Sequence, residues 1–456
     1  MEGDDTMRIA VVGTGHVGLV AAVTLAEIGH RVIGTDADAE RISLLSRGIA
    51  PFHEPGLDDL LRATTESGRL SFTPDTGEAV STAHVVFVCV GTPARSSGEA
   101  NLIAVEKAVR AIAEHASDGL VLVQKSTVPA GTAARVEQAL RTQSKGRIKR
   151  IDVVSNPEFL REGRAIRDSL DPDRILVGSA SARALRVMRA VYRPLIDKGC
   201  IYIETDVRTA ELAKHASNAF LALKISFANA LAQICERAGA DVMDVADIMG
   251  SDPRIGRAFL DAGLGYGGFC FPKDIQAFDR LAARLGYDFP LLREIARIND
   301  GAIDSAVDKL EDALWNLEDK RVTLFGLSFK PGTDDVRFSP ALALARRLLS
   351  EGSSVVGYDP QASTTAKEDL PELHVASDVY EAASGAHAVV LCTDWPEFRA
   401  LDLDLLRDAM ANPLIVDGRN LFDAAAVAAA GFDYYPTGRP LRVQPSVAGS
   451  VDGFVA

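Results

Sequence analysis

The stretch Met7-Arg-Ile-Ala-Val-Val-Gly-Thr-Gly-His-Val-Gly18 places a short apolar run directly before a GxGxxG pattern. The apolar run predicts a strand over 7–12, and the glycines open a helix that runs to Ile28. A second strand over 31–35 ends in Asp36, close to the offset of about 20 residues at which an acid takes the ribose hydroxyls. Strand, glycines, helix, strand and acid in this order predict a dinucleotide-binding unit rather than a structural turn.

The three glycines of this pattern have separate tasks in such a site. Gly13 makes the tight turn, Gly15 lets the backbone approach the pyrophosphate, and Gly18 lets helix and strand pack. Because an acid at Asp36 would repel a 2′-phosphate, the sequence favours NAD over NADP. Arg41, on the following helix, is the residue that would weaken this preference.

Two further apolar strands, predicted over 85–90 and 120–124, end in polar residues. Gly91-Thr92 follows the first strand, and Ser126-Thr127 follows the second. Since ligands of an open parallel sheet lie beyond the carboxyl ends of its strands, both polar ends are expected to face the cofactor. The Ser and Thr side chains could instead cap helices, which is their commoner task.

A strand predicted over 151–155 leads into two carboxylates. Glu158 and Glu162 follow it in the run Asn156-Pro-Glu-Phe-Leu-Arg-Glu-Gly163. Two acids four residues apart at a strand end are a candidate general acid and base. The alternative is a pair of salt-bridged surface residues.

The pattern over 208–238 predicts one long helix. Lys214 and Asn218 lie four residues apart and therefore share a face. Together they offer donors to a developing oxyanion, whereas the alternative is an exposed polar stripe. The helix is otherwise so apolar that we expect it to be buried between domains, where a lysine needs a partner.

The glycine-rich run Gly263-Leu-Gly-Tyr-Gly-Gly-Phe-Cys-Phe-Pro-Lys-Asp274 ends in a single cysteine just before a predicted helix. At a helix N-terminus, Cys270 would meet unpaired N–H groups that favour a thiolate, and Lys273 adds a positive charge. This description fits an activated nucleophile. The alternative is a buried cysteine in a structural turn.

A second α/β pattern follows. Strands are predicted over 321–325 and 354–359, the latter ending in Asp359, but the segment 326–337 carries no GxGxxG. A dinucleotide would therefore not dock there in the same way. Lys330 and Arg337 within this segment suit phosphate groups.

The whole pattern predicts an α/β protein with two Rossmann-like, doubly wound parallel-sheet domains, joined by a long central helix and a small helical domain. The predicted domains are an NAD-binding domain over 1–205, a central helical domain with the cysteine loop over 206–305, a second Rossmann-like domain that binds a nucleotide sugar over 306–440, and a mobile tail over 441–456.

The composition is that of an ordinary globular protein, with 47% hydrophobic and 25% charged residues. The formal charge of -14 argues against nucleic acid or an anionic membrane as a partner. Five scattered cysteines without a CxxC pair argue against a disulfide framework or a metal site and indicate the cytoplasm. No uninterrupted apolar run approaches the roughly 18 residues of a membrane span.

An NAD site, a cysteine, a Lys/Asn pair and two carboxylates suggest an oxidation in two stages. Oxidation of an alcohol gives an aldehyde, a thiolate adds to it, a second oxidation leaves a thioester, and water cleaves the thioester. A simple two-electron hydroxyacid dehydrogenase needs no cysteine, and it remains one alternative. A non-catalytic NAD-binding protein is another.

Seven sequence blocks, in order, resemble the UDP-glucose/GDP-mannose dehydrogenase family over nearly the whole chain to about position 440. The blocks are GTGHVGL at 13–19, VGTP at 90–93, STVPAGT at 126–132, NPEFLREG at 156–163, the Lys214/Asn218 helix, YGGFCFPKD at 266–274 and FKPGTDDVRFSP at 329–340. The resemblance implies a four-electron oxidation of a sugar 6-hydroxymethyl group to a carboxylate, with two NAD.

The resemblance also implies roles for single residues. Cys270 would be the nucleophile, Lys214 and Asn218 would hold the C6 oxygen, and Asp274 and Thr127 would handle the first proton through an ordered water. Glu162 is similar to the residue implicated in thioester hydrolysis, and Glu158 is similar to its neighbour. Arg254 matches a residue that reaches into the partner subunit's site, so a homodimer or larger assembly built on the long helix is expected.

The expected cofactor-binding residues are Gly13, Gly15, His16, Val17, Gly18, Asp36, Arg41, Val90, Gly91, Thr92, Ser126, Thr127, Glu162, Lys273 and Arg337. The expected substrate-binding residues are Glu158, Phe159, Leu160, Glu162, Lys214, Asn218, Arg254, Phe259, Tyr266, Gly267, Lys330 and Arg419.

One residue departs from the family pattern. Family members often have a small residue between the paired glycines and the cysteine, where this chain has Phe269. A bulky ring beside the thiol could reshape the sugar pocket, which leaves GDP-mannose or another UDP-hexose as alternatives. The run GYGG resembles the UDP-glucose branch more than the UDP-N-acetylhexosamine branch.

Overall fold

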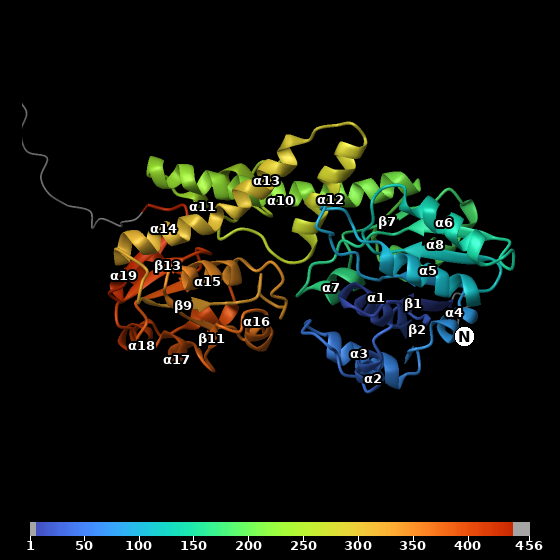
Figure 1. Cartoon of the computed structure of the whole chain (residues 1–456), viewed down its shortest axis with the longest axis horizontal. Helices are drawn as coiled ribbons and strands as arrows, with labels where there is room; N and C mark the ends of the chain where they lie inside the picture. The colour runs from blue at the N-terminus through green and yellow to red at the C-terminus, as the bar shows by residue number, and fades with distance from the viewer. Residues whose placement is uncertain (1–5, 441–456) are drawn as a thin grey trace, which may run out of the picture. The chain divides into compact units, whose positions relative to one another are not determined.

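The computed structural model describes residues 6–440; residues 1–5 and the predicted tail over 441–456 lie outside the described residues. The chain divides into two compact units. The first unit comprises Met1–Phe220, Phe269–Glu294 and Gly332–Asp334, and the second comprises Leu221–Gly268, Ile295–Pro331 and Asp335–Ala456. Each contains one predominantly or wholly parallel sheet (Figure 1). The predicted α/β class with two such sheets is confirmed.

The first unit is built on an eight-stranded sheet in the order β3-β2-β1-β4-β5-β6-β7-β8. Its strands are β1 (Arg8–Val12), β2 (Arg31–Thr35), β3 (Leu70–Thr73), β4 (Val85–Val88), β5 (Leu120–Gln124), β6 (Ile151–Ser155), β7 (Arg174–Gly178) and β8 (Ile201–Thr205). The pairs from β3 to β6 are parallel, whereas β6 meets β7 in an antiparallel pair at Ser155 and Gly178. The two strands beyond β6 were not predicted from the sequence.

Helices cover both faces of this sheet. The helices of the first unit are α1 (His16–Glu27), α2 (Ala39–Ser46), α3 (Leu57–Glu66), α4 (Thr76–Ser81), α5 (Ile103–His115), α6 (Thr132–Gln143), α7 (Ala165–Leu170), α8 (Ala182–Val191), α9 (Arg193–Ile196) and α12 (Cys270–Arg284). Along β1, Ile9 and Val11 pack with α1, α3, α7 and α8, while Ala10 and Val12 pack with α4, α5 and α6. This alternation follows from the two-residue period of a strand and explains why the strands read as continuous apolar runs.

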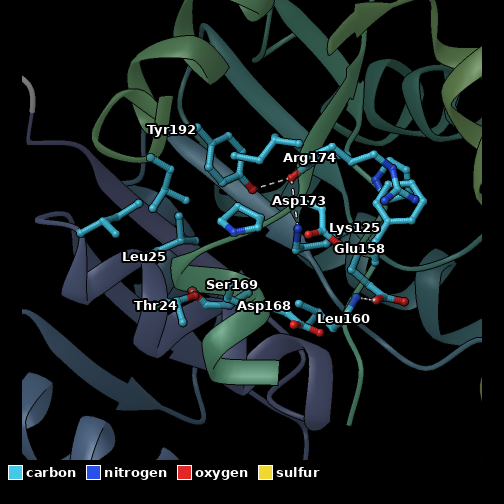
Figure 2. Close-up of a pocket in the computed structure, with 18 residues that line it drawn as sticks. Thr24, Leu25, Lys125, Glu158, Leu160, Asp168, Ser169, Asp173, Arg174 and Tyr192 are labelled. Carbon is cyan, nitrogen blue, oxygen red and sulfur yellow. Dashed lines mark hydrogen bonds between the residues drawn. The ribbon is translucent and has the colours of Figure 1, made fainter. Parts of the chain in front are cut away.

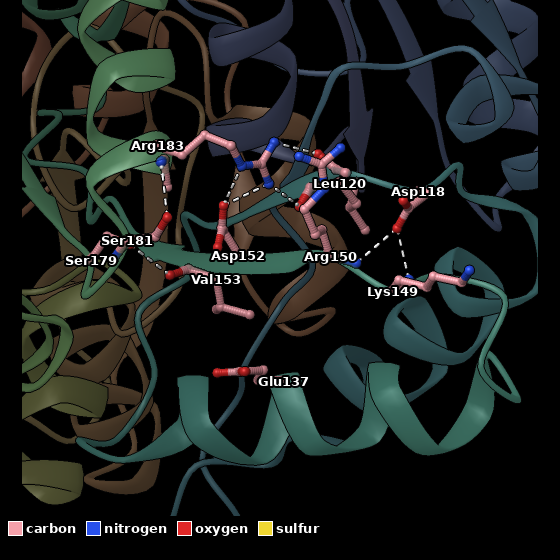
Figure 3. A network of polar contacts seen from close by, with 12 residues as sticks. Asp118, Leu120, Glu137, Lys149, Arg150, Asp152, Val153, Ser179, Ser181 and Arg183 are labelled. Carbon is pink, nitrogen blue, oxygen red and sulfur yellow. Dashed lines mark hydrogen bonds and ion pairs between the residues drawn. The ribbon is translucent and has the colours of Figure 1, made fainter.

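A polar network closes the amino ends of the central strands (Figure 3). Arg183 Nη2 lies 2.6 Å from Asp152 Oδ2, and Arg183 Nη1 donates to the Gly119 carbonyl. Asp118 Oδ1 accepts the backbone N–H groups of Lys149 and Arg150 at 2.7 Å each. The side chains of Asp118 and Arg183 therefore hold the turns at the amino ends of these strands, opposite the carboxyl ends where a ligand is expected.

The long helix is present as α10 (Val207–Ala238), with 32 residues. Its residues up to Phe220 belong to the first unit, and those from Leu221 belong to the second. The helix α13 (Pro290–Asp300) is divided in the same way, between Glu294 and Ile295. By length and composition α10 is a candidate membrane span, with a mean hydropathy of 1.2 over its most apolar window. Core helices of water-soluble proteins meet the same criterion. Lys214, His215 and Asn218 are buried along it, which suits a core helix.

The second unit contains a wholly parallel six-stranded sheet in the order β11-β10-β9-β12-β13-β14. Its strands are β9 (Arg321–Phe325), β10 (Ser354–Tyr358), β11 (His374–Val375), β12 (Ala388–Leu391), β13 (Leu414–Asp417) and β14 (Asp433–Pro436). Its helices are α11 (Val242–Gly250), α14 (Ala302–Leu314), α15 (Pro340–Ser350), α16 (Ser363–Asp369), α17 (Val379–Ala383), the 3₁₀ turn η1 (Pro396–Ala400), α18 (Leu403–Ala409) and α19 (Ala424–Ala429).

The second sheet does not repeat the dinucleotide turn of the first. Asp359 follows β10 as Asp36 follows β2, but it is only 2% exposed. Its Oδ2 accepts hydrogen bonds from the backbone N–H groups of Leu327 and Ser328 and from Trp395 Nε1, at 2.7, 2.9 and 3.0 Å. Its Oδ1 accepts the N–H groups of Gln361 and Ala362, so both oxygens of this carboxylate are already used within the protein and not offered to a ribose. This geometry agrees with the absence of a GxGxxG pattern in this half of the sequence.

Candidate active site

The turn between β1 and α1 has the shape that a dinucleotide requires. Gly13 has φ +92°, and a Cβ there would lie 2.9 Å from the Val90 backbone nitrogen. A Cβ at Gly18 would lie 1.8 Å from the Gly13 carbonyl oxygen, so only glycine fits both positions. A Cβ at Gly15 would meet no atom within 4 Å, which leaves open space at the helix N-terminus. The turn thus fits a pyrophosphate in contact with its backbone.

Asp36 lies at the end of β2, as predicted for the residue that takes the ribose. Its Oδ2 accepts the Thr14 N–H at 2.7 Å and lies 3.2 Å from Arg41 Nη1. Although burial alone would raise the pKa of Asp36, the backbone N–H groups of Thr14 and Asp38 and the charge of Arg41 hold it below its ordinary value. Arg41 is therefore paired with the acid and reinforces its charged form.

Replacing Asp36 with asparagine is expected to raise the KM for NAD about tenfold, because one charge-assisted contact to a ribose hydroxyl is lost. The kcat with saturating NAD should change little. The matched control is Asp38→Asn, which removes a neighbouring carboxylate that also lies near Arg41. Initial rates with NAD and with NADP measure both effects. An unchanged KM for NAD in Asp36→Asn would contradict the assignment.

His16 and Glu54 add a contact that the motif does not reveal. His16 stacks on Phe52 with ring centroids 4.5 Å apart, and its Nε2 lies 3.2 Å from Glu54 Oε2. The Glu54 carboxylate also accepts the N–H groups of Gly163 and Ala165 at 2.7 and 2.8 Å. Glu54 therefore ties the dinucleotide turn to the segment that carries Glu162. It was missed because Gly163 and Ala165, whose N–H groups it accepts, are 109 and 111 positions away in the sequence.

The polar ends of β4 and β5 lie side by side, as the sheet order requires. The Ser126 hydroxyl donates to the Val90 carbonyl at 2.7 Å, and the Thr92 hydroxyl donates to the Thr127 carbonyl at 2.9 Å. Neither Ser126 nor Thr92 is therefore used as a helix cap. The loop is held from α10 as well, because Glu211 accepts the N–H groups of Gly131 and Ala133.

Lys214 and Glu158 form a buried ion pair. Lys214 Nζ lies 3.0 Å from Glu158 Oε1, and their side chains are 4% and 6% exposed. Burial opposes the charge of Lys214, but Glu158, Cys270 and Asp274 hold its pKa above the ordinary value, so it is a cation at neutral pH. Glu158 is therefore not the salt-bridged surface residue that was the alternative interpretation.

Asn218 and Asp274 form a second buried contact beside the first. Asn218 Nδ2 donates to Asp274 Oδ2 at 2.6 Å, and Lys273 Nζ pairs with the other carboxylate oxygen. Burial alone would raise the pKa of Asp274, but Lys273, His215 and Lys214 hold it below its ordinary value. The site thus holds a charged carboxylate that Asn218 and Lys273 keep in place.

Cys270 is the first residue of α12, which confirms the predicted helix start. The thiol itself differs from the expectation of an activated thiolate. Burial, followed by the charge of Glu158, raises its pKa to about 12 against the opposing effect of Lys214. Lys273, expected to lower that pKa, is paired with Asp274 instead. The free protein therefore holds a protonated thiol, and ionisation must accompany ligand binding or bond formation.

Alkylation of Cys270 in the ligand-free protein should consequently become about tenfold faster with each pH unit between about pH 7 and pH 9.5. Below a raised pKa the thiolate fraction grows tenfold per unit without levelling off. Peptide mapping after brief iodoacetamide treatment measures the rate at Cys270 separately from the other thiols. A plateau below pH 9 would show instead that the free protein already contains an activated thiolate.

Three polar side chains of the first unit that were not among the predicted site residues lie next to Glu158. Lys125 Nζ donates to Asn156 Oδ1 at 3.2 Å, and the Tyr192 hydroxyl donates to the same oxygen at 2.6 Å. Lys125 lies between the strand predicted over 120–124 and the predicted site residues Ser126 and Thr127. This position in the sequence could have indicated that it lies near the site. Tyr192 offered none, because it reaches the site only through the packing of α8.

His215 is the fourth such residue and lies on α10 beside Lys214. Its ring is 1% exposed, and its Nε2 lies 3.1 Å from the Val128 carbonyl oxygen, next to Thr127. Burial lowers its pKa, so it is neutral at physiological pH. His215 lies four residues after Glu211 on α10, so the two side chains share a face of the helix. Both contact the loop that follows β5, and this spacing was the sequence signal that could have found His215.

Another group of the predicted residues belongs to the second unit. The backbone N–H of Tyr266 donates to Asn299 Oδ1 at 2.7 Å, and a Cβ at Gly267 would lie 2.4 Å from the Phe338 carbonyl oxygen. Arg419 Nε donates to the Cys392 carbonyl at 2.7 Å, which leaves its terminal nitrogens for other partners. The other members are Arg254, which is paired with Asp252, Phe259 with φ 66°, Lys330 over the Phe329 ring, and Arg337, which is paired with Asp335.

Comparison with known protein families finds three consecutive matches. Residues 7–196 match the NAD binding domain of the UDP-glucose/GDP-mannose dehydrogenase family, residues 208–301 its central domain and residues 323–424 its UDP binding domain. Together they span most of the chain.

Similar proteins cover almost the full length. The chain is 44% identical to the UDP-glucose 6-dehydrogenase YwqF of Bacillus subtilis, over 97% of this chain and 100% of the relative. It is 45% identical to a UDP-glucose 6-dehydrogenase of Rhizobium meliloti, over 95% of this chain and 100% of the relative. Among solved structures, a UDP-glucose dehydrogenase from Pyrobaculum islandicum superposes with a TM-score of 0.88 at 37% identity, covering 95% of this chain and 98% of the other.

Proposed function

The chain belongs to the UDP-glucose/GDP-mannose dehydrogenase family, whose NAD-dependent enzymes oxidise nucleotide sugars, and we propose that its own substrate is UDP-glucose. The product is UDP-glucuronate, formed by oxidation of the sugar 6-hydroxymethyl group to a carboxylate. The observation that carries this proposal is the buried group of Lys214, Glu158, Asn218 and Asp274 around the Cys270 thiol.

In the first oxidation, Lys214 and Asn218 hold the C6 oxygen of the sugar. NAD, when bound, supplies the hydride acceptor for each of the two oxidations. Asp274 takes the hydroxyl proton through an ordered water that Thr127 helps to hold. The lowered pKa of Asp274 means that it is ionised when the substrate binds, and its contact with Asn218 fixes its position.

In the second stage, the Cys270 sulfur bonds to the aldehyde carbon and gives a thiohemiacetal. As the bond forms, the Lys214 ammonium stabilises the negative charge that develops on the C6 oxygen, and the thiol proton is transferred to that oxygen to give its hydroxyl. A second oxidation leaves a thioester on Cys270. Hydrolysis by water, assisted by Glu162 and Glu158, releases the carboxylate and returns the thiol.

We assign the nucleotide sugar to the backbone of Phe159 and Leu160 and to Phe259, Tyr266, Gly267, Lys330 and Arg419. Lys273 and Arg337 join Gly13, Gly15, His16, Val17, Gly18, Asp36, Arg41, Val90, Gly91, Thr92, Ser126, Thr127 and Glu162 at the cofactor. The NAD-binding, central and sugar-nucleotide domains that we assign are those predicted over 1–205, 206–305 and 306–440.

We also assign a homodimer, with Arg254 reaching the site of the partner subunit. The surface of α10 supports this assignment, because Phe220, Phe227 and Ile234 recur every seven residues and are 62%, 48% and 59% exposed. Such a stripe is typical of a helix that packs against a second helix. The enzyme is assigned to the cytoplasm, with which its five free cysteines agree.

A substrate panel tests the proposed function. UDP-glucose, GDP-mannose and a UDP-N-acetylhexosamine are each incubated with excess NAD, and NADH yield and product mass are measured. UDP-glucose is expected to give two NADH per molecule and a product heavier by one oxygen and lighter by two hydrogens. Preference for another sugar nucleotide would overturn the substrate assignment, and a yield of one NADH would overturn the four-electron chemistry.

A further inference from the structure

A cavity of about 80 Å³ lies in the first unit, behind Glu158 (Figure 2). This rear cavity is bordered by Lys125, Asn156, Glu158, Ser169, Arg174 and Tyr192, together with apolar residues of α1 such as Ala21 and Leu25. One water molecule needs roughly 10–15 Å³ by this measure, so the rear cavity has room for several. Its polar lining offers the donors and acceptors that ordered water requires.

Glu158 connects the rear cavity to the site of chemistry. Its Oε1 contacts Lys214 Nζ at 3.0 Å, and its Oε2 accepts the Leu160 N–H at 2.7 Å. The same side chain borders the cavity. A water molecule in the cavity therefore lies within reach of a carboxylate that also touches the residue assigned to the C6 oxygen.

The other polar groups of the cavity hold one another in place. Asn156 Oδ1 accepts hydrogen bonds from Lys125 and Tyr192, and Asn156 Nδ2 donates to the Leu176 carbonyl at 2.8 Å. Burial lowers the pKa of Lys125, while the nearby Glu158 carboxylate opposes that shift, and the side chain borders the cavity. An ammonium group that borders a cavity orients the oxygen atoms of water toward itself.

We propose that the rear cavity stores and delivers the water that hydrolyses the thioester, a proposal that rests on the function proposed above. The reaction consumes this water while the sugar nucleotide is still bonded to Cys270 as the thioester. In the hydrolytic step, the water oxygen bonds to the thioester carbon and Glu158 accepts a proton from the water. The carbon–sulfur bond breaks, and Cys270 leaves with the electron pair as a thiolate that is then reprotonated.

Filling the rear cavity tests the proposal. Ser169→Leu adds apolar volume at its border, Ser169→Ala is the matched control without added volume, and Lys125→Met removes the ammonium group. Enzyme is mixed rapidly with UDP-glucose and excess NAD, quenched in acid and digested. The fraction of Cys270 that carries the thioester is followed through a single turnover, alongside NADH absorbance.

For Ser169→Leu and Lys125→Met, thioester decay should be at least about tenfold slower than in the wild type, while both NADH-forming steps stay within about twofold. Ser169→Ala should decay at the wild-type rate. Wild-type decay in both altered variants would overturn the proposal, and so would an equal slowing of decay and NADH formation. A wild-type yield other than two NADH per sugar would show that the proposed function itself is wrong. A yield of two NADH with unchanged thioester decay in the variants would show that only the role of the rear cavity is wrong.

Discussion

Replacing Cys270 with serine should lower the rate of uronate formation by at least about 10³-fold, because a hydroxyl is a far weaker nucleophile toward the aldehyde. Cys270 lies at the start of α12 among Lys214, Glu158, Glu162 and Asp274, which all affect its pKa. Serine keeps the shape of the side chain and the helix start. NAD affinity should therefore stay within about twofold, as measured by calorimetry.

The matched control for this variant is Cys200→Ser. Cys200 is a partly buried thiol that donates a weak hydrogen bond to the Ile201 carbonyl, and it has no role in the proposed reaction, so its replacement should leave turnover unchanged. Thermal unfolding of both variants shows whether either substitution disturbs the fold. Cys270→Ser with wild-type uronate formation would mean that the reaction uses no covalent intermediate on sulfur.

Replacing Lys214 with methionine should lower kcat by about 10²- to 10³-fold, the range found when one oxyanion donor is removed. Methionine has a similar length and no charge, so the loss concerns the ammonium group rather than the space it fills. NAD affinity should be unchanged, because Lys214 is assigned to the sugar oxygen. Initial rates and NAD titrations separate the two quantities.

The same substitution carries a cost in stability. It leaves the Glu158 carboxylate buried without its cation, and breaking a buried pair costs about 3–5 kcal/mol. The double variant Lys214→Met/Glu158→Gln should recover part of that stability without recovering turnover. A defect in Lys214→Met that is confined to NAD binding would contradict the role assigned to Lys214.

Much of the fold could be predicted because its signals are local. The run from Met7 to Asp36 predicts β1, α1 and β2 within a residue or two of the observed bounds. The predicted strand over 321–325 is β9, and the cysteine does begin a helix. In each case an apolar period and its terminating residues are neighbours in the sequence, so no distant contact was needed.

The remainder depends on contacts between distant segments. The antiparallel meeting of β6 and β7 is a single pair between Ser155 and Gly178, which no periodicity encodes. Glu54 was missed for the same reason, since its carboxylate reaches Gly163 and Ala165 across the fold. The state of the Cys270 thiol also escaped prediction, because burial and the neighbouring Glu158 outweigh the helix N-terminus that the sequence reveals.

The central claim is that a sulfur atom retains the aldehyde between the two oxidations. The most direct test is a single turnover of wild-type enzyme with limiting UDP-glucose, excess NAD and a hydrazine trap for free aldehyde. We expect two NADH per sugar, stoichiometric uronate and no trapped aldehyde, because the carbonyl carbon stays bonded to Cys270. One NADH per sugar, with the aldehyde recovered in the trap, would contradict the account.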